Sequence, residues 1–215
     1  MGCCDERYPK KYVNNNIDYS GSNRNRNNFN NSSGYSSHSF SSSNSCSNGS
    51  NGSCSGCFSG NGKVKLMNNT FKKIKELKKG DILENGAIVK CLIIIPINKI
   101  IEVIELNDEF YSLKHPVIFN GNWTYPKNIK KSKEIFIDNW YNLILSNGFS
   151  VIINNIEAIT LGHNQKNGIA YHPYFGTEKV IDALKKYKKF NDGEIVINKK
   201  LNIERDENGR ISKYF

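Results

Sequence analysis

The chain contains no run of about 18 consecutive apolar residues, the length that a membrane-spanning helix needs. Its N-terminus also lacks the apolar segment of a secretory signal peptide. We therefore expect a cytoplasmic protein that is not secreted and that is anchored to a membrane only if its N-terminus carries a lipid.

Cysteine is scarce in the part of the chain that can fold, which argues against a disulfide framework. The six cysteines are Cys3, Cys4, Cys46, Cys54, Cys57 and Cys91, so four of them precede residue 56. Cys54 and Cys57 form a CxxC pair, but no strand and helix flank it as in redox folds, and no second pair completes a zinc site. We expect no metal or other cofactor, and we expect Cys91 to be a core residue.

The excess of positive charge lacks a dominant block. Lys and Arg number 30 against 20 Asp and Glu, and the net charge of +10 divides into +1 for residues 1–13, +1 for 14–56 and +8 for 57–215. Basic residues are not interleaved with aromatic ones, and no nucleic-acid-binding motif is present. A solvated lysine surface accounts for this charge, and we expect no nucleic-acid partner.

Residues 14–56 consist largely of three small polar residue types. Twelve Asn, 15 Ser and 5 Gly fill 32 of these 43 positions. Such a segment cannot bury enough apolar surface to offset the entropic cost of ordering it. We therefore expect residues 1–56 to form a disordered arm. Residues 57–215 hold nearly all the Ile, Leu and Val, and we expect them to form one compact domain.

The first four residues, Met1-Gly2-Cys3-Cys4, offer acceptors for two kinds of acylation. Removal of Met1 would expose Gly2 for myristoylation, and the thiols of Cys3 and Cys4 suit palmitoylation. Two acyl chains anchor a protein stably where one does not. Glu6 occupies the position at which the myristoylation pattern has Ser or Thr, so an unmodified, exposed terminus is the alternative.

Short apolar runs recur between turn signals from residue 63 onward, and their β-branched and aromatic residues favour strands. The runs cover residues 63–66, 87–95, 100–106, 109–113, 141–145 and 149–153. The turns at 84–86, 120–122 and 146–148 each contain Asn and Gly, which adopt the positive φ of tight turns. The pattern predicts an all-β domain, with segment 70–79 as a turn-rich connector.

One helix is expected late in the chain, with Thr177 as its N-cap. Its apolar face would consist of Val180, Ile181, Leu184 and Tyr187. Further strands are expected at 193–197, 200–205 and 210–215, and the turn at 207–209 predicts a C-terminal hairpin extension.

An ordered series of motifs runs through residues 57–215. They are CFSGNGKVKL from Cys57, Ser112-x-x-His115-Pro116, Tyr141-Asn142-Leu143, INNIEAITLGHN at 153–164, HPYFGTEKVIDAL at 172–184 and IERDENGRI at 203–211. In this order they resemble the Hint superfamily, the self-processing domains of hedgehog proteins and inteins. The resemblance is closest to the Hint variant found beside von Willebrand factor A domains. It implies a Hint-type fold of many short strands.

The resemblance also implies a reaction at the 56–57 peptide bond. Cys57 would attack the Gly56 carbonyl in an N-to-S acyl shift that gives a thioester. Ser112 and His115 match the family's TxxH motif, in which the histidine polarises the scissile amide and protonates its leaving nitrogen. Water, a hydroxyl or an amine would then resolve the thioester. The chain would thus cleave itself once, without a cofactor.

The sequence departs from inteins near its C-terminal motifs. His163-Asn164 resembles the His-Asn pair that ends inteins, so His163 is a further candidate catalytic residue. Gln165 follows in place of Cys, Ser or Thr, and the expected fold continues, so we expect no full protein splicing. Phe149 stands where another histidine often occurs. Cyclisation of Asn164 and structural roles for His163 and His172 remain open.

Two alternatives remain. The domain could be a catalytically inactive Hint-fold interaction module that its N-terminal arm tethers to a membrane. A disulfide between Cys54 and Cys57 could also mask the nucleophile. If the arm is both acylated and cleaved off, processing would release the folded domain from the membrane.

Overall fold

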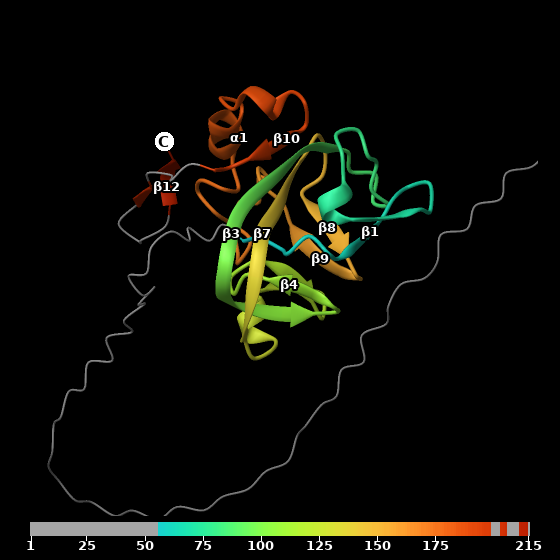
Figure 1. Cartoon of the computed structure of the whole chain (residues 1–215), viewed down its shortest axis with the longest axis vertical. Coiled ribbons are helices and arrows are strands. Elements are labelled where there is room, and N and C mark those ends of the chain that lie inside the picture. The colour runs from blue at the N-terminus through green and yellow to red at the C-terminus, as the bar shows by residue number, and fades with distance from the viewer. Residues whose placement is uncertain (1–55, 199–202, 206–210, 215) are drawn as a thin grey trace, which may run out of the picture. The chain divides into compact units, whose positions relative to one another are not determined.

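The computed structural model describes residues 56–198, 203–205 and 211–214. Within these ranges strands predominate, which confirms the all-β fold class expected from the sequence (Figure 1). Most of the expected arm, including Gly2, Cys3, Cys4 and Cys54, lies outside the described residues, so its disorder stays a prediction. No helix in the described part is long and apolar enough to cross a bilayer.

The described residues form twelve strands, one α-helix and three 3-10 helices. The strands are β1 (Lys63–Lys65), β2 (Phe71–Lys73), β3 (Val89–Leu106), β4 (Glu109–Tyr111), β5 (Val117–Phe119), β6 (Asn122–Thr124), β7 (Lys133–Leu145), β8 (Ser150–Ile153), β9 (Ile156–Ile159), β10 (Glu194–Val196), β11 (Ile203–Arg205) and β12 (Ile211–Tyr214). The helices are η1 (Ile74–Glu76), η2 (Pro126–Asn128), α1 (Glu178–Leu184) and η3 (Lys188–Phe190).

Two long antiparallel strands, β3 and β7, run side by side through the domain (Figure 1). The two runs that we expected to form separate strands on either side of Pro96 are joined in β3. The pairing with β7 skips from Pro96 to Lys99, and Asn98 has a φ of 47°. An extra residue here forms a β-bulge, which lets the strand continue past the proline. On the flanks of β3, β4 pairs antiparallel and β10 pairs parallel.

A second four-stranded sheet has the order β6-β5-β9-β8. Asn120 and Gly121 connect β5 to β6, and their φ values of 50° and 77° are those of a tight hairpin turn, as expected from the sequence. The turn at 146–148 does not close a hairpin, because the strands on its two sides pair elsewhere: β7 pairs with β3, and β8 pairs with β9. It therefore links the two sheets.

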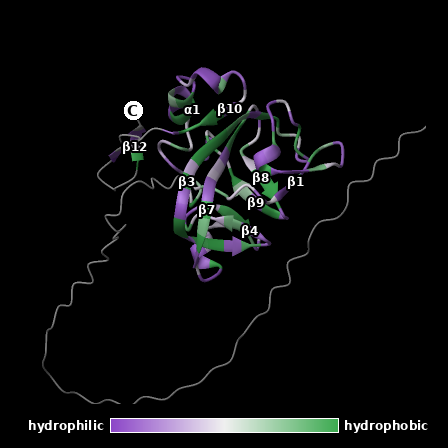
Figure 2. Cartoon of the chain, viewed as in Figure 1, coloured by the Kyte–Doolittle hydropathy of each residue, from purple (hydrophilic) through white to green (hydrophobic). Residues whose placement is uncertain are grey.

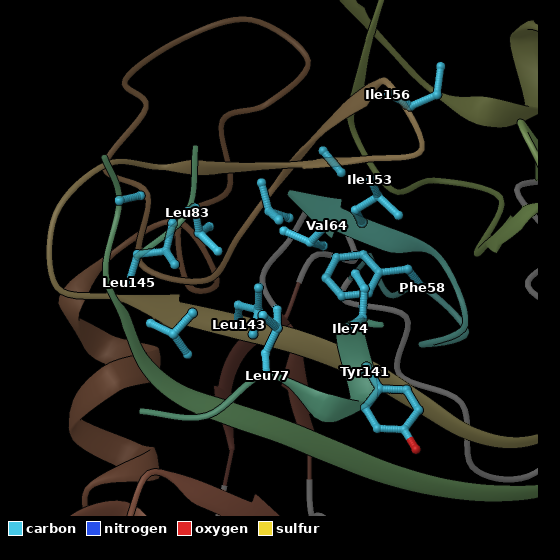
Figure 3. Packing of buried hydrophobic residues seen from close by; sticks show 14 of the residues in the cluster. Phe58, Val64, Ile74, Leu77, Leu83, Tyr141, Leu143, Leu145, Ile153 and Ile156 are labelled. Carbon is cyan, nitrogen blue, oxygen red and sulfur yellow. The ribbon is translucent and has the colours of Figure 1, made fainter. Parts of the chain in front are cut away.

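The main apolar core is formed by both four-stranded sheets together with Phe58. Leu143 and Leu145 of β7 pack in one cluster with Ile153 of β8 and Ile156 of β9 (Figure 3). Hydrophobic and hydrophilic stretches alternate along β3 and β7 (Figure 2). The long strands therefore contribute to the core along only part of their length.

The expected late helix is present as α1. Val180, Ile181 and Leu184 are buried in a second cluster. Thr177 is the N-cap residue, but its hydroxyl donates to the carbonyls of Pro173 and Tyr174, so the expected capping bond to the helix is not made. After β10, β11 and β12 pair antiparallel, as expected for a C-terminal hairpin. The expected turn at 207–209 lies outside the described residues.

Candidate active site

Cys57 lies in an extended segment between β4 and β7. The Phe58 N–H donates to the Tyr141 carbonyl of β7 at 3.1 Å, and the Tyr141 N–H donates to the Phe58 carbonyl at 2.8 Å. The Cys57 carbonyl accepts a hydrogen bond of 3.0 Å from the Ser112 N–H, which follows β4 directly. The backbone of the candidate nucleophile is thus held from two neighbouring strands.

The carbonyl of the 56–57 peptide bond is held by Asn142. The Asn142 Nδ2 donates to the Gly56 oxygen at 2.6 Å, and the Asn142 Oδ1 accepts from the Leu143 N–H at 2.7 Å. Because a backbone N–H can only donate, this second bond fixes which end of the amide faces Gly56. Asn142 is buried in β7, so the donor is fixed in place and shielded from water.

The nitrogen of the same peptide bond is held by Ser112. The Cys57 N–H donates to the Ser112 Oγ at 3.1 Å. Ser112 is buried, and its own N–H contacts the Cys57 carbonyl. Both polar atoms of the 56–57 peptide bond therefore have side-chain partners.

His115 lies against Gly56 and is fully buried. A Cβ built on Gly56 would be 2.5 Å from His115 Nδ1, so the ring edge faces the residue before the nucleophile. The Nε2 atom lies 2.9 Å from the Ile159 carbonyl of β9. A carbonyl only accepts, so Nε2 carries the proton in the neutral ring and Nδ1 has the lone pair.

The surroundings of His115 keep its ring neutral. Phe58 and Tyr111 pack around it, with ring centroids 5.3 Å and 6.0 Å from the imidazole. Burial lowers the pKa of His115 to about 4, although the Gly56 and Ile159 backbone groups partly offset this effect. At neutral pH the ring can therefore accept a proton at Nδ1 but holds no extra proton to donate.

The side chain of Cys57 packs in an apolar cluster. Its neighbours in this cluster are Val103 of β3 and Ile137 and Trp140 of β7, and only 3% of Cys57 is exposed. Cys91 is also buried, in the second core cluster, as expected for a core residue. Burial raises the pKa of the Cys91 thiol to about 12, which makes this second cysteine a poor nucleophile.

His163 lies near His115 but is held by contacts of its own. Its Nδ1 accepts from the Gln165 N–H at 3.1 Å, and its ring packs against Gly176. Burial lowers its pKa to about 4, and a charge on it would lower the pKa of His115 further. His172 Nδ1 accepts from two backbone N–H groups, of Tyr174 and Phe175, which is a structural arrangement.

The structure brings Gly56, Cys57, Ser112 and His115 together. Their catalytic roles, like that of His163, stay predictions. The sequence motif contained Asn142, but its contact with the scissile carbonyl was not expected. The sequence offered one sign of this role, namely that Asn142 is a polar residue within the apolar run 141–145. Among the residues that the structure describes, no group of three or more His, Cys, Asp or Glu side chains could hold a metal ion.

An all-β domain with a buried cysteine beside a Ser-x-x-His motif has the arrangement of a Hint domain. Residues 56–213 match the family model named Vint, which is described as a Hint-domain. The match covers most of the chain, so the chain belongs to this family. Autoprocessing is the general activity of Hint domains. A comparison with curated proteins finds no matching sequence.

Proposed function

We propose that this domain breaks the Gly56–Cys57 peptide bond through an N-to-S acyl shift. The observation that carries the proposal is that both polar atoms of this peptide are held by buried side chains. Asn142 donates to the carbonyl oxygen, and Ser112 accepts from the amide N–H. A peptide held in this way, next to a cysteine and a neutral histidine, is oriented for attack.

The first step forms the carbon–sulfur bond. His115 Nδ1 takes the proton of the Cys57 thiol, and Sγ attacks the Gly56 carbonyl carbon. The carbonyl oxygen gains negative charge, which the Asn142 amide stabilises by the hydrogen bond that it already makes. The low pKa of His115 makes it a weak base, so the proton is readily passed on.

The second step breaks the carbon–nitrogen bond. The imidazolium returns its proton to the Cys57 nitrogen, which leaves as an amine, and a thioester joins Gly56 to Cys57 Sγ. The Ser112 hydroxyl holds this nitrogen during the transfer. The thiol proton thus ends on the amine, and the shift needs no other reactant.

A nucleophile then resolves the thioester. Water, a hydroxyl or an amine attacks the Gly56 carbonyl, and the Cys57 thiol is released with the folded domain. Full splicing is not part of the proposal. Asn164 is followed by Gln165, and the fold continues beyond them through α1.

The proposed partners are the chain itself in cis and a membrane that acyl groups on Gly2, Cys3 or Cys4 would reach. Cleavage would then release the domain from that membrane. Cell fractionation of the Cys57→Ala variant tests this part, because the uncleaved chain should sediment with membranes. Recovery of the uncleaved variant in the soluble fraction would contradict the coupling.

Timed cell-free synthesis followed by intact-mass measurement tests the cleavage. We expect two products, one ending at Gly56 and one beginning at Cys57. The Cys91→Ala variant is the matched control, since it also loses one buried cysteine, and it should cleave as the wild type does. Cys57→Ala should stay whole. A wild-type chain that also stays whole would instead favour the inactive interaction module.

A further inference from the structure

Glu109 of β4 is a buried carboxylate to which the acyl shift described above gives no role. None of its surface is exposed, and burial raises its pKa. Its Oε1 accepts from the Ser59 hydroxyl at 2.9 Å and from the Gly60 N–H at 2.9 Å. Both donors are uncharged. A carboxylate buried among uncharged donors is costly and uncommon in a protein interior, so Glu109 is a candidate for a role beyond packing.

The two donors to Glu109 come two and three residues after the candidate nucleophile. The chain turns sharply at Gly60, where φ is 90°. A Cβ at Gly60 would collide with the Tyr141 ring, so the turn is packed tightly against β7. Movement of this turn would therefore be transmitted to Cys57.

We propose that Glu109 is a positioning residue for the acyl shift, holding Ser59 and Gly60 so that Cys57 stays aligned with the Gly56 carbonyl. This inference rests on the proposed function. Asn142 of β7 anchors the chain before the scissile bond, and Glu109 of β4 anchors it after the nucleophile.

The benefit of two anchors follows from the geometry of the reaction. Sγ must approach the carbonyl carbon through a five-membered ring, which an extended peptide does not favour. A misplacement of about 1 Å in such a reaction can cost about 100-fold in rate. Holding the chain on both sides of Cys57 keeps the displacement of Sγ and the carbonyl carbon smaller than this.

The test compares cleavage rates of full-length variants in timed cell-free synthesis. Glu109→Ala should cleave at least about tenfold more slowly than wild type, and Ser59→Ala should be slowed by a smaller factor. Glu109→Gln keeps an oxygen for Ser59 and Gly60 but loses the charge that strengthens these bonds, so it should cleave more slowly than wild type and faster than Glu109→Ala. Ser150→Ala is the control for Ser59→Ala, because it removes a partly buried hydrogen bond between a serine and a glutamate, Glu157, on β8 and β9.

A pH profile separates positioning from simple stabilisation. Glu109 accepts hydrogen bonds as a carboxylate, and its raised pKa places its protonation above the ordinary value of 4.5. The wild-type rate should fall as the pH drops through this pKa, and Glu109→Gln should lack that decrease. Both chains should lose rate further near pH 4, where His115, the proposed base, becomes protonated. Thermal melting of each variant in a Cys57→Ala background reports its stability independently of cleavage.

Three results would overturn the inference: wild-type cleavage by Glu109→Ala, equal slowing by Ser59→Ala and Ser150→Ala, or identical pH profiles for wild type and Glu109→Gln. If Glu109→Ala does not fold, the comparison of Ser59→Ala with Ser150→Ala and the pH profile of Glu109→Gln still test the inference. Wild-type and Cys57→Ala chains are assayed in parallel. Absence of Cys57-dependent cleavage in the wild type would reject the proposed function together with this inference, whereas wild-type cleavage that is indifferent to Glu109 would reject the inference alone.

Discussion

Asn142 Nδ2 and the Gly56 carbonyl oxygen lie 2.6 Å apart, although the two residues are 86 positions apart in the sequence. The bond depends on the pairing that places the Cys57 segment beside β7. The scissile carbonyl therefore has its donor only when the domain has folded. Cleavage is accordingly expected after folding and not in the unfolded chain.

Replacing Asn142 with Asp tests the donor. The substitution keeps the size of the side chain but puts a negative charge where the carbonyl oxygen becomes negative, so cleavage should slow by about 100- to 1,000-fold. Asn122→Asp makes the same chemical change at an exposed position of β6 and should cleave normally. Rates come from the timed appearance of the cleaved domain. Equal rates for the two variants would contradict a role for the Asn142 amide.

Substitutions at Ser112 test the partner of the Cys57 nitrogen. Ser112→Ala removes the acceptor of a buried N–H and should slow cleavage by about 5- to 150-fold, since a lost hydrogen bond is worth about 1–3 kcal/mol. Ser112→Thr keeps the hydroxyl and should retain most of the rate. The same timed assay measures both variants. If Thr were as slow as Ala, packing and not the hydroxyl would be the limiting factor.

Gly56 should be the one residue that this site accepts before Cys57. A Cβ at position 56 would lie 2.5 Å from His115 Nδ1 and 2.6 Å from the His115 Cα, so Gly56→Ala must displace the scissile peptide. We expect cleavage to be almost abolished while the melting temperature of the uncleaved domain changes little. Gly86→Ala is the control, because its φ of 80° makes it strained but it lies in open space. Gly86→Ala should have a lower melting temperature than the unsubstituted domain and should still cleave.

Acid should weaken the fold through His115. In the folded state its pKa is lowered to about 4 from an ordinary value of 6.5, so between these values the unfolded chain binds more protons. The free energy of unfolding should therefore decrease as the pH falls from 6.5 towards 4. Urea unfolding of Cys57→Ala at several pH values measures this slope.

The double variant Cys57→Ala, His115→Gln should show a shallower dependence on pH in that range. The raised pKa of Glu109 acts in the opposite direction, but it contributes equally to both chains and cancels in the comparison. Identical slopes for the two chains would mean that His115 is not held neutral by the fold.

The sequence was sufficient to predict the all-β class and the late helix, because local patterns encode them. Ser112 and His115 were predicted through the resemblance of the ordered motifs to a Hint domain. It did not predict that β3 continues past Pro96, since only pairing with β7 shows that the bulge at Asn98 accommodates the proline. Glu109 was not identified, because a glutamate at the first position of the predicted strand 109–113, next to Asn107 and Asp108, is usually exposed. Its burial depends on tertiary contacts with Ser59 and Gly60.

Hydroxylamine capture is the sharpest test for a thioester at Gly56. Freshly synthesised chain is treated with neutral hydroxylamine, and the mass of the released N-terminal fragment is measured alongside that of a Cys57→Ala chain treated in the same way. The account predicts a fragment that ends at Gly56 and carries a hydroxamate, formed only when Cys57 is present. Failure to detect any hydroxamate-carrying fragment, or cleavage that persists in Cys57→Ala, would show that no such thioester forms.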